Sequence, residues 1–318
     1  MAVKGKLRNQ KKRNNHESAD SLKKIRILPL LSLGAIFALV TAAHAQNLYV
    51  STQRPPSHAI LEFTPSGTQS TYASGLLFPR GLAFDSIGNL FAAETVAPGD
   101  RDLLIGRLLK FNLRNHVSTV GSVVNFFFEG LAVDIAGNAY VMANDQTSPT
   151  GASTIFKFTP DGERIVFGSV PSQGWGLAFD SAGNLYAAEG VVDFGPDRTI
   201  FKFAPDGTRT VFVGPDAFPE GEYPVGLAFD SNGNLFVSIE TFTDPGADSI
   251  VYFTPSGMKS IFATGLTFPR GLAFDGSGNL FVAEAIQPGD ILKFFPDGTH
   301  TVFASGFGRP EFLTFGPR

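Results

Sequence analysis

Beyond residue 45, the chain alternates between short apolar runs rich in Val, Ile, Leu and Phe and short polar segments rich in Gly, Asp, Asn and Pro. Runs such as GLAFD (81–85) and NLFAAE (89–94) are too short for helices and favour strands. In the D-x-x-G-N segments between them, the Asp side chain accepts backbone N–H groups and the Gly takes positive φ, as tight turns require. The pattern predicts antiparallel β-hairpins along the chain.

These hairpins recur as one unit of 41–50 residues. The second half of the unit is a second hairpin, as in IFKFTPDGERIVF (155–167), whose P-D-G turn joins two further strands. Four strands in this length are typical of a propeller blade. Copies of the first strand occur at 81–85, 130–134, 176–180, 226–230, 271–275 and, in degenerate form, 312–315.

The two ends of the repeat region complement each other. Residues 47–52 (NLYVST) match the second strand of a unit without its first, and residues 311–316 (EFLTFG) match a first strand with nothing after it. Pairing them would complete a sixth blade and remove the open sheet edges. The sequence thus predicts an all-β, six-bladed propeller of four-stranded antiparallel blades over residues 46–318, and we expect a monomer.

The repeated motif P-x-G-L-A-F-D-S-x-G-N-L-F-V-A-E, followed by I-x-K-F-T-P-D-G-T, resembles the NHL repeat and the gluconolactonase (senescence-marker) group of six-bladed propellers. The resemblance covers essentially all of residues 47–318 and implies the same fold. Such propellers include lactonases, lyases, sensor domains and interaction scaffolds, so the resemblance alone selects no activity.

Residues 1–45 have the pattern of a bacterial secretory signal: a basic stretch, the apolar run 27–43 and a final AHA before Gln46. We expect export to the periplasm or the medium, with an uncleaved membrane anchor as the alternative. Residues 1–45 contain nine of the 25 Lys and Arg but two of the 29 Asp and Glu, so the remainder has a net charge of −11. This charge disfavours nucleic acid and anionic lipid, and the absence of Cys leaves stability to the core.

Long and variable connections are expected on one face of the propeller, where the first strand of each blade begins; we call this the top face. The opposite, bottom face has short and nearly identical turns, so a binding site is expected at the top. The repeated Asp lacks the spacing of a calcium loop, and we assign it to turn formation. This Asp occurs as Asp85, Asp134, Asp180, Asp230 and Asp275.

One position per blade, just before the first-strand Gly, should face the mouth of the central channel. Around the ring, this position holds Arg80, Glu129, Trp175, Val225, Arg270 and Glu311. In one interpretation, Arg270–Glu311 and Arg80–Glu129 pair between neighbouring blades and close the channel, with Trp175 covering apolar surface. In the other, the two Arg bind a carboxylate while Trp175 stacks on the ligand.

In the gluconolactonase group this position supplies metal ligands, so the resemblance implies that Glu129 and Glu311 could hold Ca²⁺ or another divalent cation. The two Arg would repel such an ion, and no cofactor is predicted outside that alternative. A second tier of polar residues ends the second strands. These residues either form a carboxylate crown or accept hydrogen bonds from the top-face loops: Glu94, Asn144, Glu189, Glu240 and Glu284.

No nucleophile–base pair or metal motif is recognisable in the sequence. We therefore expect a module that binds a small anionic or carbohydrate-like ligand, or a peptide or protein partner, at its top face without turnover. The alternatives are a divalent-metal-dependent lactonase or esterase of the gluconolactonase type and a structural module of the cell envelope.

Overall fold

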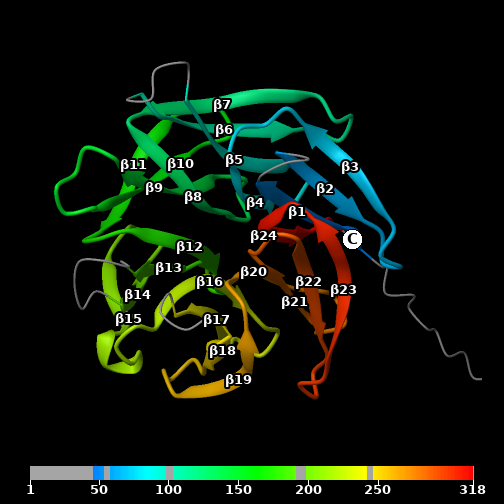
Figure 1. The fold of residues 1–318 in the computed structure, drawn as a ribbon. Coiled ribbons are helices and arrows are strands. Elements are labelled where there is room, and N and C mark those ends of the chain that lie inside the picture. Colours follow the sequence, from blue (N-terminus) through cyan, green and yellow to red (C-terminus); the bar gives the residue numbers. More distant parts are fainter. Residues whose placement is uncertain (1–45, 54–57, 98–102, 191–197, 242–245, 318) are drawn as a thin grey trace, which may run out of the picture. The chain divides into compact units, whose positions relative to one another are not determined.

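The computed structural model describes residues 46–53, 58–97, 103–190, 198–241 and 246–317. They form six four-stranded antiparallel sheets arranged as the blades of a β-propeller (Figure 1). One short 3₁₀ turn, Pro215–Ala217, is the helical element within these ranges. None of the described segments is a helix long and apolar enough to cross a bilayer. The predicted all-β fold is confirmed, whereas the predicted signal segment lies outside the described residues.

Each blade has the same order of strands from the centre outwards. The innermost strands are β4 (Pro79–Phe84), β8 (Phe126–Val133), β12 (Gly174–Phe179), β16 (Tyr223–Phe229), β20 (Pro269–Phe274) and β24 (Arg309–Phe315). The second strands are β5 (Leu90–Val96), β9 (Ala139–Asp145), β13 (Leu185–Gly190), β17 (Leu235–Glu240), β21 (Leu280–Glu284) and β1 (Leu48–Gln53).

The outer half of each blade is a second hairpin. The third strands are β6 (Ile105–Phe111), β10 (Ser153–Phe158), β14 (Arg198–Phe203), β18 (Asp248–Phe253), β22 (Gly289–Phe294) and β2 (Ala59–Phe63). The outermost strands are β7 (Val117–Val124), β11 (Arg164–Val170), β15 (Arg209–Val213), β19 (Lys259–Leu266), β23 (His300–Phe307) and β3 (Gln69–Ser74).

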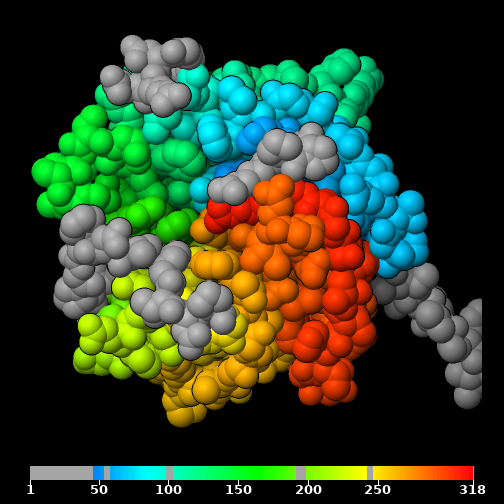
Figure 2. Space-filling view, viewed as in Figure 1, coloured from blue at the N-terminus to red at the C-terminus, as the bar shows by residue number. Residues whose placement is uncertain are grey.

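The last blade combines both ends of the repeat region, as the sequence predicts. Strand β24 pairs antiparallel with β1, with Phe315 opposite Leu48 and Leu313 opposite Val50. Figure 1 shows this pair as red beside blue, and Figure 2 shows the colours following the ring to the same junction. Strand β24 begins at Arg309, two residues before the predicted start, which brings Arg309 and Pro310 into the pairing.

The core lies between the blades and contains aromatic rings from every blade. The last residue of the third strand is a phenylalanine in every blade, and each is almost inaccessible to solvent: Phe63, Phe111, Phe158, Phe203, Phe253 and Phe294. Burial of such a side chain contributes about 2–3 kcal/mol. Because one phenylalanine recurs per blade, the repeat itself accounts for much of the stability expected of a chain without Cys.

The repeated Asp forms the bottom turn, as expected. In the blade that starts at β4, Asp85 Oδ1 accepts the backbone N–H of Asn89 at 2.8 Å, and Oδ2 accepts the Asn89 amide at 2.6 Å. Gly88 takes the positive φ of +91° that the turn needs. The same Asp–Asn pair is present at Asp134, Asp180, Asp230 and Asp275. These carboxylates therefore satisfy backbone and amide donors of their own turns.

Candidate functional site

The innermost strands meet closely around the centre of the ring. A Cβ atom at Gly226 would lie 1.8 Å from the carbonyl oxygen of Arg270, so this position admits no side chain. The residues just before the first-strand glycines, and Glu311 at the same position of β24, form the hub ring. The hub ring consists of Arg80, Glu129, Trp175, Val225, Arg270 and Glu311, as the repeat alignment predicted.

An ion-pair network joins five of the six blades, four through hub-ring residues and one through Glu240. Arg270 Nη1 donates to Glu311 Oε2 at 2.6 Å, and Arg80 Nη1 lies 3.3 Å from the same oxygen. Arg80 Nη1 is also 3.0 Å from Glu129 Oε2. Arg270 Nε donates to Glu240 Oε1, from the second tier, at 2.8 Å. Arg80 is the most exposed side chain among these five, at 11%. Both ion pairs expected between neighbouring blades are present.

The apolar residues of the hub ring, Trp175 and Val225, are buried, and a hub arginine covers the Trp175 ring. The Arg270 guanidinium lies over the Trp175 ring, 5.2 Å from its centroid. The indole N–H of Trp175 donates to the carbonyl of Gly190 at 2.9 Å, and the residue is 6% exposed. Val225 is fully buried. Arg270 and Trp175 therefore contact each other at the mouth, and Arg80 is the more accessible of the two hub arginines.

The buried charges of the network have shifted pKa values. Burial raises the pKa of Glu129 to about 7, against the opposing effect of Arg80. Burial also raises the pKa of Glu240, although Arg270 opposes it. Burial acts in the same direction on Glu311, but Arg80, Arg270 and Arg309 together hold its pKa below the ordinary value. Glu311 is thus the anionic centre of the network.

The second tier mainly braces the connections of the top face. Glu94, Glu189 and Glu284 accept backbone N–H groups from the segments that lead into their own blades, at 2.7–3.0 Å. Asn144 accepts from the Ser153 hydroxyl at 2.6 Å. Glu240 is the member that pairs with the hub ring. These contacts correspond to the loop-bracing interpretation of the second tier.

The hub ring and the second tier do not fit a divalent cation. The described residues contain no group of three His, Cys, Asp or Glu that could hold a metal ion. Glu129 and Glu311, the candidate ligands, both lie within ion-pair distance of Arg80. A metal at this centre would have to displace arginines that already neutralise the carboxylates.

A top-face pocket of about 290 Å³ lies beside the hub ring, where the blades that contain β20 and β24 meet. It is lined by Phe268, Ala285, Ile286, Gln287 and Arg309. Arg309 Nε is 3.1 Å from Glu311 Oε1, and the side chain is 24% exposed. Burial lowers the pKa of Arg309. The structure shows no hydrogen bond from its guanidinium to a described residue.

The site predicted from the sequence omits Arg309, although the repeat contains a signal for it. Aligning RPEF (309–312) with FPRG (268–271) places Arg309 where the blade before it has Phe268. A charged residue at an aromatic position of the repeat therefore marks the pocket. From the sequence, the first strand of the last unit is expected over residues 311–316, which leaves Arg309 outside the unit.

No protein-family model matches the sequence, and no curated protein matches it. Solved structures do match in fold. A protein of unknown function from Bacteroides caccae is 14% identical, covers 86% of this chain and 100% of its own, and gives a TM-score of 0.59. A gluconolactonase from Xanthomonas campestris is 18% identical, with 75% and 83% coverage and a TM-score of 0.55.

The calcium-binding protein regucalcin from Agrobacterium tumefaciens is also similar, with 15% identity, 73% and 75% coverage and a TM-score of 0.51. At these identities the likeness concerns the fold. The chain is a six-bladed β-propeller with the architecture found in gluconolactonase and regucalcin.

Proposed function

We propose that this propeller is a binding module whose top face takes a small anionic ligand in the pocket beside the hub ring. The observation that carries the proposal is Arg309, which lines this pocket and is partly exposed. Its guanidinium makes no hydrogen bond to a described residue. A guanidinium presents paired N–H donors that match a carboxylate. The site thereby differs from the original prediction, which used Arg80, Arg270 and Trp175.

The surroundings of Arg309 suit a carboxylate that carries a less polar body. Phe268 and Ile286 supply apolar surface in the lining of the pocket. Glu311 lies behind Arg309 Nε at 3.1 Å and fixes that part of the side chain, which reduces the entropy lost on binding. Gluconate and phenylacetate are suitable probes, one resembling a carbohydrate and the other aromatic.

Calorimetric titration tests this proposal. We expect saturable binding of at least one probe, and a loss of about tenfold or more in affinity in Arg309→Met, because a charge-assisted pair is removed. The matched control is Arg164→Met on the outer strand β11, which should leave affinity unchanged. Glucose and phenylethanol should bind more weakly because they lack the carboxylate. Unchanged affinity in Arg309→Met would exclude this pocket.

A divalent-metal-dependent lactonase or esterase is the second candidate. The comparisons favour it over binding without turnover, because they include a gluconolactonase and a calcium-binding protein of the same fold. Its metal ligands would be Glu129 or Glu311, whose present partners are arginines. Thermal unfolding with Ca²⁺, Zn²⁺ or Mn²⁺ and hydrolysis of a lactone panel test it. A metal-dependent shift together with turnover would establish this candidate in place of the first.

We also propose that the protein acts outside the cytoplasm. Support comes from the basic and apolar pattern of residues 1–45 followed by AHA. Fractionation of bacterial cells expressing the full chain, with mass determination of the N-terminus, should give an exported protein that begins at Gln46. An intact N-terminus in the membrane fraction would instead indicate the anchor.

A further inference from the structure

The six blades provide an internal comparison at their bottom face. In four of them, a lysine of the third strand lies over an aromatic ring of the second strand, with Nζ 5.1–5.6 Å from the ring centroid. In two of these blades, Nζ is also close to the Asp of the bottom turn, 3.9 Å for Lys110–Asp85 and 3.8 Å for Lys202–Asp180. The four pairs are Lys110–Phe91, Lys157–Tyr140, Lys202–Tyr186 and Lys293–Phe281.

The blade formed by β16–β19 lacks this lysine. Tyr252 occupies the position, and its ring stacks on Phe236 with centroids 5.3 Å apart and planes 22° apart. Asp230 still accepts hydrogen bonds from Asn232 and Asn234 of its own turn. It forms no ion pair with a described residue, so its carboxylate lacks the cation that Asp85 and Asp180 have.

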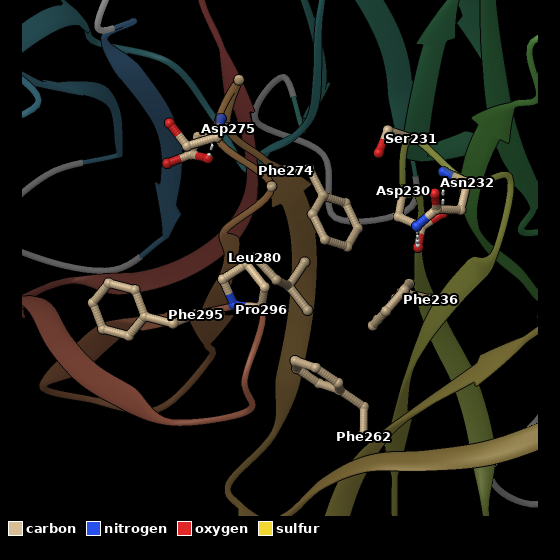
Figure 3. A pocket seen from close by; sticks show the side chains of 13 residues that line it. Asp230, Ser231, Asn232, Phe236, Phe262, Phe274, Asp275, Leu280, Phe295 and Pro296 are labelled. Atoms are coloured by element: carbon tan, nitrogen blue, oxygen red, sulfur yellow. Dashed lines mark hydrogen bonds between the residues drawn. The ribbon is translucent and has the colours of Figure 1, made fainter. Parts of the chain in front are cut away.

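A pocket of about 520 Å³ opens beside Asp230, between the blades that contain β17 and β21. The rings of Phe236, Phe262 and Phe274 line it, together with Asp230 and Asp275. Figure 3 shows Phe236 and Phe262 below Asp230 and Phe274 beside it, with Asp275 on the other side of Phe274. The described residues that line the pocket include no Lys, Arg or His. The pocket thus joins two carboxylates to aromatic surface without a basic residue in its lining.

Lys293 is the nearest equivalent cation in the neighbouring blade. Its Nζ lies over Phe281 and Phe295, at 5.4 and 5.3 Å from the ring centroids. It forms no ion pair with Asp275 in the described part of the chain. Neither Asp230 nor Asp275 therefore has a lysine partner in the described part of the chain.

We propose that this pocket binds a small organic cation, an ammonium group attached to an apolar or aromatic body. The ammonium would lie beside Asp230, which has no lysine partner among the described residues, and the body would contact Phe236, Phe262 and Phe274. The volume falls within the range of about 300–1,000 Å³ that is usual for small-molecule sites. Aromatic rings beside a carboxylate are the chemistry that recognises such cations.

Isothermal titration of the protein with benzyltrimethylammonium tests the proposal, with benzyl alcohol as the neutral control. We expect saturable one-to-one binding of the cation and at least about tenfold weaker binding of the alcohol. Tyr252→Lys restores the internal lysine and should abolish binding of the probe. This substitution is at a partly exposed position, and thermal unfolding will verify the fold.

Asp230→Asn removes the charge and should weaken binding by about tenfold. Asp180→Asn is its matched control, because it alters the same turn in a blade that keeps its lysine, and it should leave binding unchanged. Absence of binding, equal binding of the alcohol, or unchanged affinity in folded Tyr252→Lys would each overturn the proposal.

Discussion

Glu129 and Glu311 occupy the same position of the repeat but ionise differently. Glu311 has three arginines around it, with Arg270 at 2.6 Å, and its pKa lies below the ordinary value despite burial. Glu129 is equally buried but has one arginine at ion-pair distance, Arg80 at 3.0 Å, and burial raises its pKa to about 7. The number of nearby guanidinium groups therefore sets the pKa values of these two buried carboxyls apart.

This difference predicts a pH dependence of stability. A carboxyl with a raised folded-state pKa binds its proton more tightly in the folded protein than in the unfolded chain. Its contribution to stability is therefore fully present below pH 4.5 and is lost as the pH rises to about 7. Glu129→Gln should remove this loss. The free energy of unfolding of the variant minus that of the unaltered protein should therefore increase by about 3 kcal/mol from pH 4 to pH 8.

Urea unfolding of both proteins at each pH measures this difference. Glu163→Gln, on the exposed turn between β10 and β11, is the control and should show a constant difference across the same range. A constant difference for Glu129→Gln as well would mean that Glu129 has the same pKa in the folded and unfolded states, with Arg80 fully compensating its burial.

At the scale of elements, backbone contact sets the spacing of the blades. The first-strand glycine of one blade packs against the backbone of the next. At Gly226, a Cβ atom would lie 1.8 Å from the carbonyl oxygen of Arg270. The hub side chains reach one another because the strands that carry them are this close. The repeated Gly of GLAFD is thus a packing requirement in addition to a feature of the repeat.

Gly226→Ala should accordingly destabilise the protein by at least about 2 kcal/mol, since strands β16 and β20 must separate. Gly214→Ala is the matched control, because its φ of −93° suits alanine and its Cβ would approach Val211 no closer than 3.9 Å. The control should change stability by about 0.5 kcal/mol or less. Chemical denaturation measures both variants, and equal stabilities would show that the blades can move apart at no cost.

The sequence predicts strands, turns and blade order because each depends on local residues that recur six times. It also predicts which residues meet at the hub, since the repeat register places them. It does not predict contacts that depend on side-chain reach across the ring, such as Arg270 over Trp175 or Arg270 with Glu240. The sequence does not predict Arg309 as a site residue because the expected last strand begins at residue 311, whereas pairing with β1 extends β24 to include Arg309.

At the scale of the whole molecule, closure of the ring also completes the hub network. Strand β24 supplies both the pairing partner of β1 and Glu311, which contacts Arg80, Arg270 and Arg309. Without β24, an edge of β1 would be open and two hub arginines would lose a buried carboxylate. Sheet closure and charge balance therefore depend on the same seven residues, Arg309–Phe315.

Deletion of residues 309–318 should consequently abolish the monomeric, cooperatively folded state, whereas deletion of residues 317–318 should leave it intact. Size-exclusion chromatography and thermal unfolding measure the two forms. Adding a peptide of residues 308–316 should restore a cooperative transition to the longer deletion, because the strand can pair with β1 in trans. The same peptide with Glu311→Gln should restore it less well, since pairing is retained but Arg80 and Arg270 lose their shared carboxylate. Equal rescue by both peptides would show that closure needs the strand alone, and a stable monomer without any peptide would show that the other five blades hold the ring.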